Sequence, residues 1–291
     1  MMNMKTSLPH AKNLRKMPRV AAVHDISGYG KCSLTVAIPV LSAAGVEVCP
    51  VPAAILSTNT LFPNFTFTDA TDHMRACIKH WKELGLSFDS VYSGFLGSAE
   101  QIELVLELIR GFDSGIAVVD PVMGDNGNII KTYTPELCAK MRDLAAAADI
   151  ATPNVTEACI LTGEEFKGNS LSRDEARRFC EKIKAMGTGS VVLTGTTRGN
   201  KLYNCLIEEN GAYSEDEVEL LDFQMHGTGD LFTSVMTAAL LRGFSLPEAV
   251  NSAGRFVRDV MLLSLEIEDT AERGVAFEPL VYKLSGGIYR A

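Results

Sequence analysis

The sequence lacks the features of several protein classes. No window of about 18 uninterrupted apolar residues occurs, so no membrane-spanning helix is expected. The formal net charge of −9 argues against a general nucleic-acid-binding surface, although it allows phosphate sites built from backbone N–H groups. The seven Cys include no C-x-x-C pair, which argues against a zinc site or a disulfide framework and fits a reducing, cytoplasmic location.

The chain also lacks any linker, low-complexity tract or internal repeat. Its first 18 residues carry several Lys and Arg but are followed by no apolar signal core. We therefore expect a disordered tail over residues 1–18 and a single domain over residues 19–291. The hydrophobic content of 46% is enough for a large core.

Short apolar segments alternate with helical ones along the chain. The predicted strands are 19–24, 47–56, 90–95, 116–121, 150–152 and 190–194. Predicted helix starts carry capping residues at Ser98, Thr134, Ser172 and Ser245. This alternation predicts a mostly parallel sheet with helices on both faces. An Asn-Gly turn at 210–211 predicts an antiparallel hairpin at one edge of that sheet.

The run His226-Gly-Thr-Gly-Asp230 precedes an apolar helix and has the strongest chemical content. Its two glycines would let the N–H groups of the first helical turn approach a transferring phosphoryl group. Asp230 would then take the proton from an attacking hydroxyl. The alternative is a glycine-rich turn with Asp230 as an ordinary helix cap, and the motif alone does not decide between them.

Two further predicted strand ends carry polar side chains. Asp120-Pro-Val-Met-Gly-Asp125 offers two carboxylates that could hold Mg²⁺, or that could simply stabilise turns. Thr152-Pro-Asn-Val-Thr-Glu157 offers an amide and a carboxylate three residues apart. These two side chains could hold a magnesium ion or form the capping box of a helix.

The glycine-rich loop Asp25–Ser33 contains Gly30-Lys31 but is not a P-loop. That motif requires Gly where Asp25 stands and Ser or Thr where Cys32 stands. The dinucleotide-binding fingerprint fails at Ser33. The loop follows the first strand, so a contact with a small molecule is still expected there.

Taken together, these loops resemble the ribokinase-like superfamily and, within it, the pyridoxal kinase family. The resemblance covers about residues 19 to 245 and rests on four segments in the same order: Ser93–Gln101, Asp120–Asp125, Thr152–Glu157 and Gly227–Asp230. It implies a three-layer α/β fold and ATP-dependent phosphorylation of the 5′-hydroxymethyl group of pyridoxal, pyridoxine or pyridoxamine. It further implies a homodimer, Mg²⁺ with the nucleotide, and a monovalent cation such as K⁺.

The resemblance also implies roles for individual residues. Asp230 would be the catalytic base, assisted by Gly227, Thr228 and Gly229 at the γ-phosphoryl group. The vitamin side would be formed by Asp25, Thr60, Phe95 and Asp230, and the metal site by Asp120, Asp125 and Glu157. The nucleotide side would be formed by Asp120, Thr152, Asn154, Glu157, Thr194, Val218, Leu221, Gly227 and Gly229. Residues Gly124–Gly127 would belong to a mobile flap that excludes water.

The chain departs from the family pattern at two positions. Asp25 stands where this branch usually has Ser, which leaves the preferred vitamer open, and Thr194 replaces a Lys or Ser. A hydroxymethylpyrimidine kinase is the main alternative, although related subfamilies of that branch often carry Cys at the position of Asp230. A sugar kinase would need a β-strand lid, for which residues 20–60 show no insertion. A non-catalytic vitamin- or nucleotide-binding protein is a further alternative, which the retained Asp230 disfavours.

Overall fold

The computed structural model describes residues 17–112, 115–131 and 133–289. The strands are β1 (Arg19–Ser27), β2 (Glu47–Leu56), β3 (Phe67–Asp69), β4 (Ser90–Ser93), β5 (Ile116–Val119), β6 (Gly124–Asp125), β7 (Asn128–Ile129), β8 (Ile150–Ala151), β9 (Ser190–Arg198), β10 (Lys201–Ile207) and β11 (Tyr213–Glu219). The helices are α1 (Leu34–Ala43), α2 (Thr71–Glu83), α3 (Ala99–Gly111), α4 (Pro135–Ala146), α5 (Val155–Thr162), α6 (Arg173–Lys184), α7 (Thr228–Leu241), α8 (Leu246–Ser264), α9 (Thr270–Arg273) and the 3₁₀ turn η2 (Val281–Leu284).

The tail predicted over residues 1–18 lies outside the described residues except for its last two positions. Of these, Pro18 already extends the pairing between the segments of β1 and β2, because its carbonyl accepts a hydrogen bond from the N–H of Glu47 at 2.8 Å. Within the described ranges, no helix has the length and apolar character needed to cross a membrane.

One sheet contains nine strands of the described residues, in the order β11-β10-β9-β8-β5-β4-β1-β2-β3. Strands β2, β1, β4, β5, β8 and β9 pair in parallel, and β10 and β11 add an antiparallel hairpin. The predicted mostly parallel sheet with an antiparallel edge is therefore confirmed. The antiparallel strand β3 was not predicted, because its three residues are all exposed and carry no alternating pattern.

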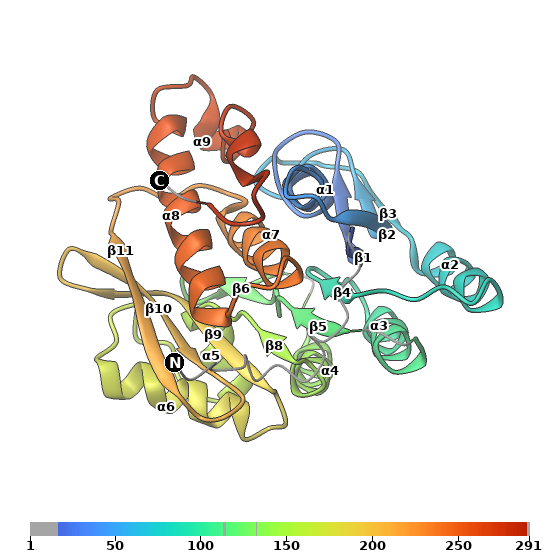
Figure 1. Ribbon diagram of the computed structural model, residues 1–291, viewed down its shortest axis with the longest axis horizontal. Helices are drawn as coiled ribbons and strands as arrows, with labels where there is room; N and C mark the ends of the chain where they lie inside the picture. The colour runs from blue at the N-terminus through green and yellow to red at the C-terminus, as the bar shows by residue number, and fades with distance from the viewer. Residues whose placement is uncertain (1–16, 113–114, 132, 290–291) are drawn as a thin grey trace, which may run out of the picture.

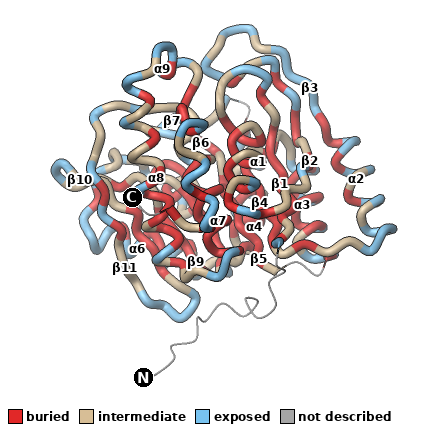
Figure 2. The backbone as a smooth tube through the Cα atoms, turned by 45° about the horizontal axis from the view of Figure 1, so that its top comes forward, coloured by how far each residue is buried: buried red, intermediate tan, exposed pale blue. Residues whose placement is uncertain are grey.

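Helices cover both faces of the sheet and enclose two separate cores (Figure 1). On one face, α1, α7 and α8 pack over a core that includes Phe256 and Leu231. On the other face, α2 to α6 pack over a core that includes Met141 and Phe88. Figure 2 shows buried backbone running through the sheet between these layers, with exposed residues at the loops and outer helices. This is the three-layer α/β arrangement that the resemblance implied.

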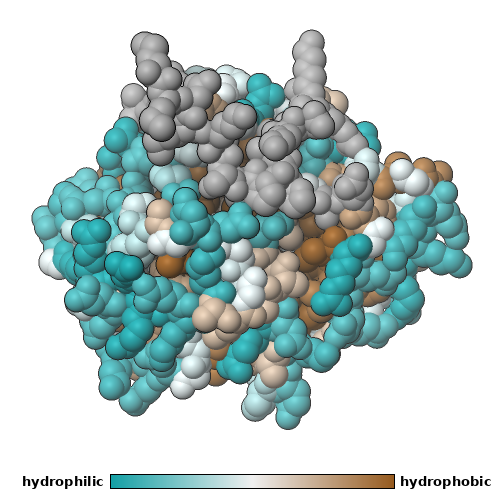
Figure 3. Space-filling view, turned by 60° about the horizontal axis from the view of Figure 1, so that its bottom comes forward, coloured by the Kyte–Doolittle hydropathy of each residue, from teal (hydrophilic) through white to brown (hydrophobic). Residues whose placement is uncertain are grey.

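The distribution of apolar and charged residues in each helix follows from which of its faces are exposed. Helix α6 has its apolar residues on one side, and Lys182 on its other side pairs with Glu164 at 2.7 Å. Figure 3, in which the lower side of Figure 1 comes forward, shows a mainly hydrophilic surface. Helix α7 is instead buried at every residue from Leu231 to Leu241, as its largely apolar sequence predicts.

The predicted helix starts are confirmed by their hydrogen bonds. The Ser98 side chain accepts from the N–H of Gln101, and Thr134 caps α4 in the same way. Ser172 and Ser245 form capping boxes. The strands predicted over 90–95 and 116–121 end two residues early, at Ser93 and Val119. For the second strand the reason is Pro121, which lacks the N–H that a sheet ladder needs.

The order of the strands reverses beside β1. The chain passes from β1 to β2 on one side and then returns to place β4 on the other side. In parallel sheets, ligands bind beyond the carboxyl ends of the strands at such a reversal. Asp25, near the end of β1, and Asp120, directly after β5, both lie at this edge of the sheet.

Candidate active site

Asp230 lies in the first turn of α7, three residues after Gly227. Gly227 has a φ of 86°, and a Cβ built there would lie 2.3 Å from the carbonyl oxygen of Lys31. Only glycine fits this close approach. The turn that begins α7 therefore packs directly against the loop that follows β1.

The first turn of α7 has the properties of an anion site. The earliest bond recorded in this helix runs from the N–H of Leu231 to the carbonyl of Gly227, at 2.9 Å. The N–H groups before it have no acceptor within the helix and point out of its positive end. A Cβ built on Gly229 would lie 4.0 Å from Oδ2 of Asp120, so the end of β5 lies beside this turn. Thr228 uses its hydroxyl locally, donating to the carbonyl of Met225 at 3.3 Å.

The surroundings of Asp230 suit a proton acceptor. Burial raises the pKa of its carboxyl from 3.8 to about 7, the nearby charge of Asp25 adds to the rise, and a hydrogen bond from the N–H of Ser33 opposes it. A general base works best when its pKa lies close to the working pH. The hydroxyl of Tyr92, which the sequence did not point to, lies 3.5 Å from the carbonyl oxygen of Asp230 and packs beneath the turn.

Asp25 lies at the end of β1 and is only 5% exposed. Its Oδ1 accepts a hydrogen bond from Ser33 Oγ at 2.6 Å, and its Oδ2 accepts one from Ser27 Oγ at 3.3 Å. Burial raises the pKa of Asp25, and the two serine hydroxyls counteract the rise. The residue that departs from the family pattern is thus held by two hydroxyl groups beside the candidate base.

Asp120, directly after β5, and Glu157, in the first turn of α5, form a buried acidic pair. Burial raises the pKa of Asp120 well above its usual range, and the charges of Glu157 and Asp230 raise it further. Burial also raises the pKa of Glu157, although its carboxylate accepts hydrogen bonds from the N–H groups of Met123 at 3.1 Å and Asn154 at 2.9 Å. Asn154 and Glu157 form the capping box of α5, one of the two interpretations that the sequence left open.

The third carboxylate predicted for a metal site, that of Asp125, is exposed, although its charge is close enough to raise the pKa of Glu157. Asp125 is exposed on the β6–β7 hairpin, where its carboxylate accepts hydrogen bonds from Asn126. In the part of the chain that the structure describes, no group of three or more His, Cys, Asp and Glu side chains is placed to hold a metal ion. The pair Asp120 and Glu157 still suits a divalent cation, because a positive charge would relieve the cost of burying two carboxylates together.

The β6–β7 hairpin contains the predicted flap Gly124–Gly127. Asn154 Nδ2 donates to the carbonyl of Gly124 at 2.8 Å, and the N–H of Gly127 donates to Thr156 Oγ1 at 2.9 Å. The hairpin is therefore tied to the start of α5 at the beginning of β6 and at its turn. Its mobility stays a prediction.

The residues predicted for the vitamin side are spread around the loop ends. Thr60 is exposed in the loop after β2. Phe95 is half-buried after β4, with its ring centroid 6.1 Å from that of Tyr133. Of these residues, Asp25 is the one whose charge raises the pKa of Asp230.

The residues predicted for the nucleotide side lie toward β8, β9 and β11. Thr152 shares a buried hydrogen bond of 3.1 Å with Thr233 of α7. The N–H of Thr194 donates to the carbonyl of Pro153 at 2.9 Å. Val218 is buried against α8, since a Cβ on Gly254 would lie 3.5 Å from its side chain, whereas Leu221 is half-buried just beyond β11.

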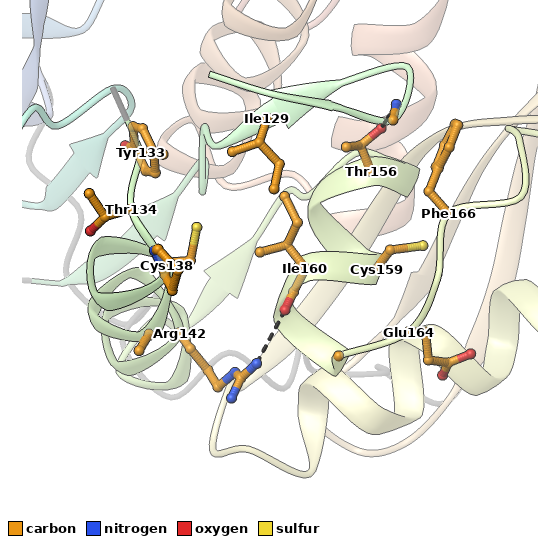
Figure 4. A pocket seen from close by; sticks show the side chains of 14 residues that line it. Ile129, Tyr133, Thr134, Cys138, Arg142, Thr156, Cys159, Ile160, Glu164 and Phe166 are labelled. Atoms are coloured by element: carbon orange, nitrogen blue, oxygen red, sulfur yellow. Dashed lines mark hydrogen bonds between the residues drawn. The ribbon is translucent and has the colours of Figure 1, made fainter. Parts of the chain in front are cut away.

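A cavity of about 600 Å³ lies beneath the hairpin, between α4 and α5 (Figure 4). Its lining is mainly apolar and comes from Gly127, Ile129, Tyr133, Thr134, Pro135, Cys138, Ala139, Arg142, Thr156, Cys159, Ile160, Gly163, Glu164 and Phe166. None of the residues predicted for catalysis, substrate or metal lines this cavity. It borders the candidate site through the hairpin and through Thr156, which directly precedes Glu157.

Comparison with known proteins gives a family and several relatives. The family model described as phosphomethylpyrimidine kinase matches residues 37–274. The pyridoxine kinase of Bacillus subtilis is 30% identical over 209 residues, which cover 69% of this chain and 74% of that protein. The hydroxymethylpyrimidine/phosphomethylpyrimidine kinase of the same organism is 29% identical over 182 residues, which cover 62% of this chain and 65% of that protein.

A solved crystal structure is also similar to this chain. A Bacteroides thetaiotaomicron protein, provisionally named a phosphomethylpyrimidine kinase and crystallised with pyridoxal, is 36% identical to this chain. The two structures superpose with a TM-score of 0.88, and the match covers 92% of this chain and 96% of the other. The predicted ribokinase-like fold is thereby confirmed.

Proposed function

The chain belongs to the phosphomethylpyrimidine kinase family of the ribokinase-like superfamily, and from this membership we propose that it phosphorylates the 5′-hydroxymethyl group of pyridoxal, pyridoxine or pyridoxamine with ATP. One observation carries the proposal. The carboxyl of Asp230, with a pKa of about 7, lies in the first turn of α7 beside Asp120 and Asp25. A base, a phosphate cradle and acidic groups for a metal therefore lie within one site.

Asp230 would act as the general base. Its carboxylate takes the proton as the O–H bond of the substrate breaks, and the oxygen attacks the γ-phosphorus of ATP. A new P–O bond forms, and the bond to the leaving ADP breaks. The products are the phosphate ester and ADP, with the proton left on Asp230.

The glycine turn would stabilise the transferring group. The N–H groups of the Gly227–Gly229 segment lie at the positive end of α7, where negative charge is favoured. Mg²⁺ bound with the nucleotide near Asp120 and Glu157 would neutralise phosphate charge. The hairpin at Gly124–Gly127 would shield the γ-phosphoryl group from water, which competes with the hydroxymethyl group as acceptor.

The choice of acceptor is the finer part of the proposal. The Bacteroides relative bound pyridoxal in its crystal, which supports a pyridine ring over a pyrimidine. The hydroxymethylpyrimidine kinases are also similar to this chain, so they supply the second candidate function. The pyridine ring and the pyrimidine ring differ in their ring nitrogens, and the pyrimidine also carries an amino group. Asp25 would face whichever of the two rings is bound.

A steady-state assay with Mg-ATP separates these two functions. We expect kcat/KM to be higher for at least one of pyridoxal, pyridoxine and pyridoxamine than for hydroxymethylpyrimidine. A clear preference for hydroxymethylpyrimidine would assign the chain to the second function. Turnover of none of the four would favour a binding protein without activity.

Asp230→Asn tests the base directly. The amide keeps the size of the side chain but cannot accept the proton, so we expect kcat to fall by about 10²–10⁴. Binding of ATP and of the vitamin, measured by calorimetry, should be retained. Wild-type turnover in this variant would show that Asp230 is not the base.

The homodimer, the monovalent cation and the cytoplasmic location stay predictions. Sedimentation of the purified protein would test the first. Activity measured with K⁺, Na⁺ and neither ion would test the second.

A further inference from the structure

Ser33 has an unusual backbone conformation for a residue that is not glycine. It directly precedes α1 with a φ of 53° and a ψ of −129°. Its side chain makes no capping hydrogen bond to α1, and the residue is only 6% exposed. Strain of this kind is retained only where the surroundings impose it, and it is concentrated at functional sites.

Ser33 acts on both acids of the candidate site. Its Oγ donates to Oδ1 of Asp25 at 2.6 Å, in a fully buried hydrogen bond. Its backbone N–H faces the carboxylate of Asp230 and lowers the pKa of that group, against the effect of burial. The torsion φ sets the direction of the side chain relative to the N–H, so the positive value lets these two donors reach two different acids.

The loop around Ser33 is clamped against the start of α7. The N–H of Lys31 donates to the carbonyl of Arg273 at 2.7 Å, and the carbonyl of Lys31 lies against Gly227. A Cβ built on Gly274 would lie 3.0 Å from the same carbonyl. Ser33 therefore cannot relax its backbone without disturbing the turn that carries Asp230.

We propose that Ser33 is a positioning residue, which links Asp25 to Asp230 and holds the base at a fixed place relative to the acceptor-binding acid. The inference rests on the proposed function, in which Asp230 takes the proton and Asp25 faces the ring. The two carboxylates repel each other when both are ionised, so each needs a donor to fix its direction. Ser33 turns one donor toward each, its hydroxyl toward Asp25 and its backbone N–H toward Asp230.

Two substitutions remove the hydroxyl in different ways. Ser33→Ala keeps a side chain at the strained φ, and Ser33→Gly relieves the strain. Both leave the backbone N–H in place. We expect kcat with pyridoxal to fall by about tenfold to a hundredfold in each, because a displacement of the order of 1 Å at a reacting group costs that much. The KM for ATP should stay within about twofold of its wild-type value, since the nucleotide contacts lie on the other side of the site.

Thr35→Val is the matched control. Thr35 lies in the same turn, where its Oγ1 donates to the carbonyl of Cys32 at 2.7 Å and accepts from the N–H of Cys32 at 3.3 Å. It has no recorded contact with either acid, so the variant should melt at a lower temperature but keep the wild-type kcat. A loss of kcat equal to that of Ser33→Ala would point to a general need for the loop and would overturn the inference.

A double variant tests the link itself. If Ser33 acts through Asp25, then Asp25→Ala combined with Ser33→Ala should lower kcat no further than the stronger single change. Fully additive losses would overturn the link. If Ser33→Ala does not fold, Ser33→Gly carries the test, because the glycine backbone favours this conformation.

Different results would overturn the role of Ser33 and the role of Asp230. Wild-type kcat in Ser33→Ala and Ser33→Gly, together with an inactive Asp230→Asn, would overturn the role of Ser33 and keep the base. An active Asp230→Asn would overturn the base, and the positioning role with it.

Discussion

Nδ2 of Asn126, at the tip of the β6–β7 hairpin, donates a hydrogen bond to Oε1 of Gln224 at 3.1 Å, across 98 positions of sequence. Oδ1 of Asn126 also accepts from Nδ2 of Asn169 at 2.9 Å. Gln224 lies three residues before Gly227. The hairpin is therefore fastened to the segment that leads into the candidate phosphate site.

Removing the hydrogen bond between Asn126 and Gln224 should raise the hydrolysis of ATP relative to phosphate transfer to the vitamin. We expect Gln224→Ala to release inorganic phosphate from ATP several-fold faster when no vitamin is present, because water reaches the γ-phosphoryl group more easily. The measurement compares phosphate released with phosphate ester formed. Glu209→Ala, on the exposed turn between β10 and β11, should leave this ratio unchanged. An unchanged ratio in Gln224→Ala would show that the hairpin does not control water access.

The pH dependence of kcat/KM should report the pKa of Asp230. The carboxyl must be ionised to accept a proton, and its pKa is raised to about 7. Activity should therefore rise with pH and level off above that value. Asp25→Asn removes a nearby negative charge, so the acid limb should move to lower pH. An acid limb below a pH of about 5 in the wild-type protein would mean that another group controls the step.

The raised pKa of Asp230 also predicts a cost in stability. Between its ordinary pKa of 3.8 and its folded value of about 7, folding takes up a proton, so this contribution to stability falls as the pH rises through that window. Asn does not titrate. We expect Asp230→Asn to raise the melting temperature at pH 8 and to change it much less at pH 4. A stabilisation that is equal at both pH values would contradict the assignment.

The buried acids at Asp120 and Glu157 should make magnesium binding sensitive to Glu157→Gln. The amide loses the charge and also weakens the capping box of α5. Glu175→Gln weakens the equivalent capping box of α6, on the outer surface, and serves as the control. Both variants should melt at lower temperature, and only Glu157→Gln should need more Mg²⁺ for half-maximal activity. A raised requirement in both variants would make the effect structural.

Several features could be predicted because they depend on neighbouring residues. The capping residues Ser98 and Ser172 bond to N–H groups three positions away, so their role is written in the local sequence. The chemistry expected of Gly227 and Asp230 likewise needs only a glycine turn before an apolar helix. The local sequence at Asn154 and Glu157 allowed two interpretations, a magnesium site or a capping box, and the structure shows the capping box.

Local residue patterns were enough to predict the alternation of strands and helices, the antiparallel hairpin at the edge of the sheet, and the segments that end on polar residues. Which of those residues meet depends on the packing of the layers. The conformation of Ser33 is imposed by contacts of its loop with Gly227 and Arg273, and the link between Asn126 and Gln224 spans the site. Contacts between residues so far apart in the chain depend on how the layers pack, and no local pattern of residue types encodes that packing.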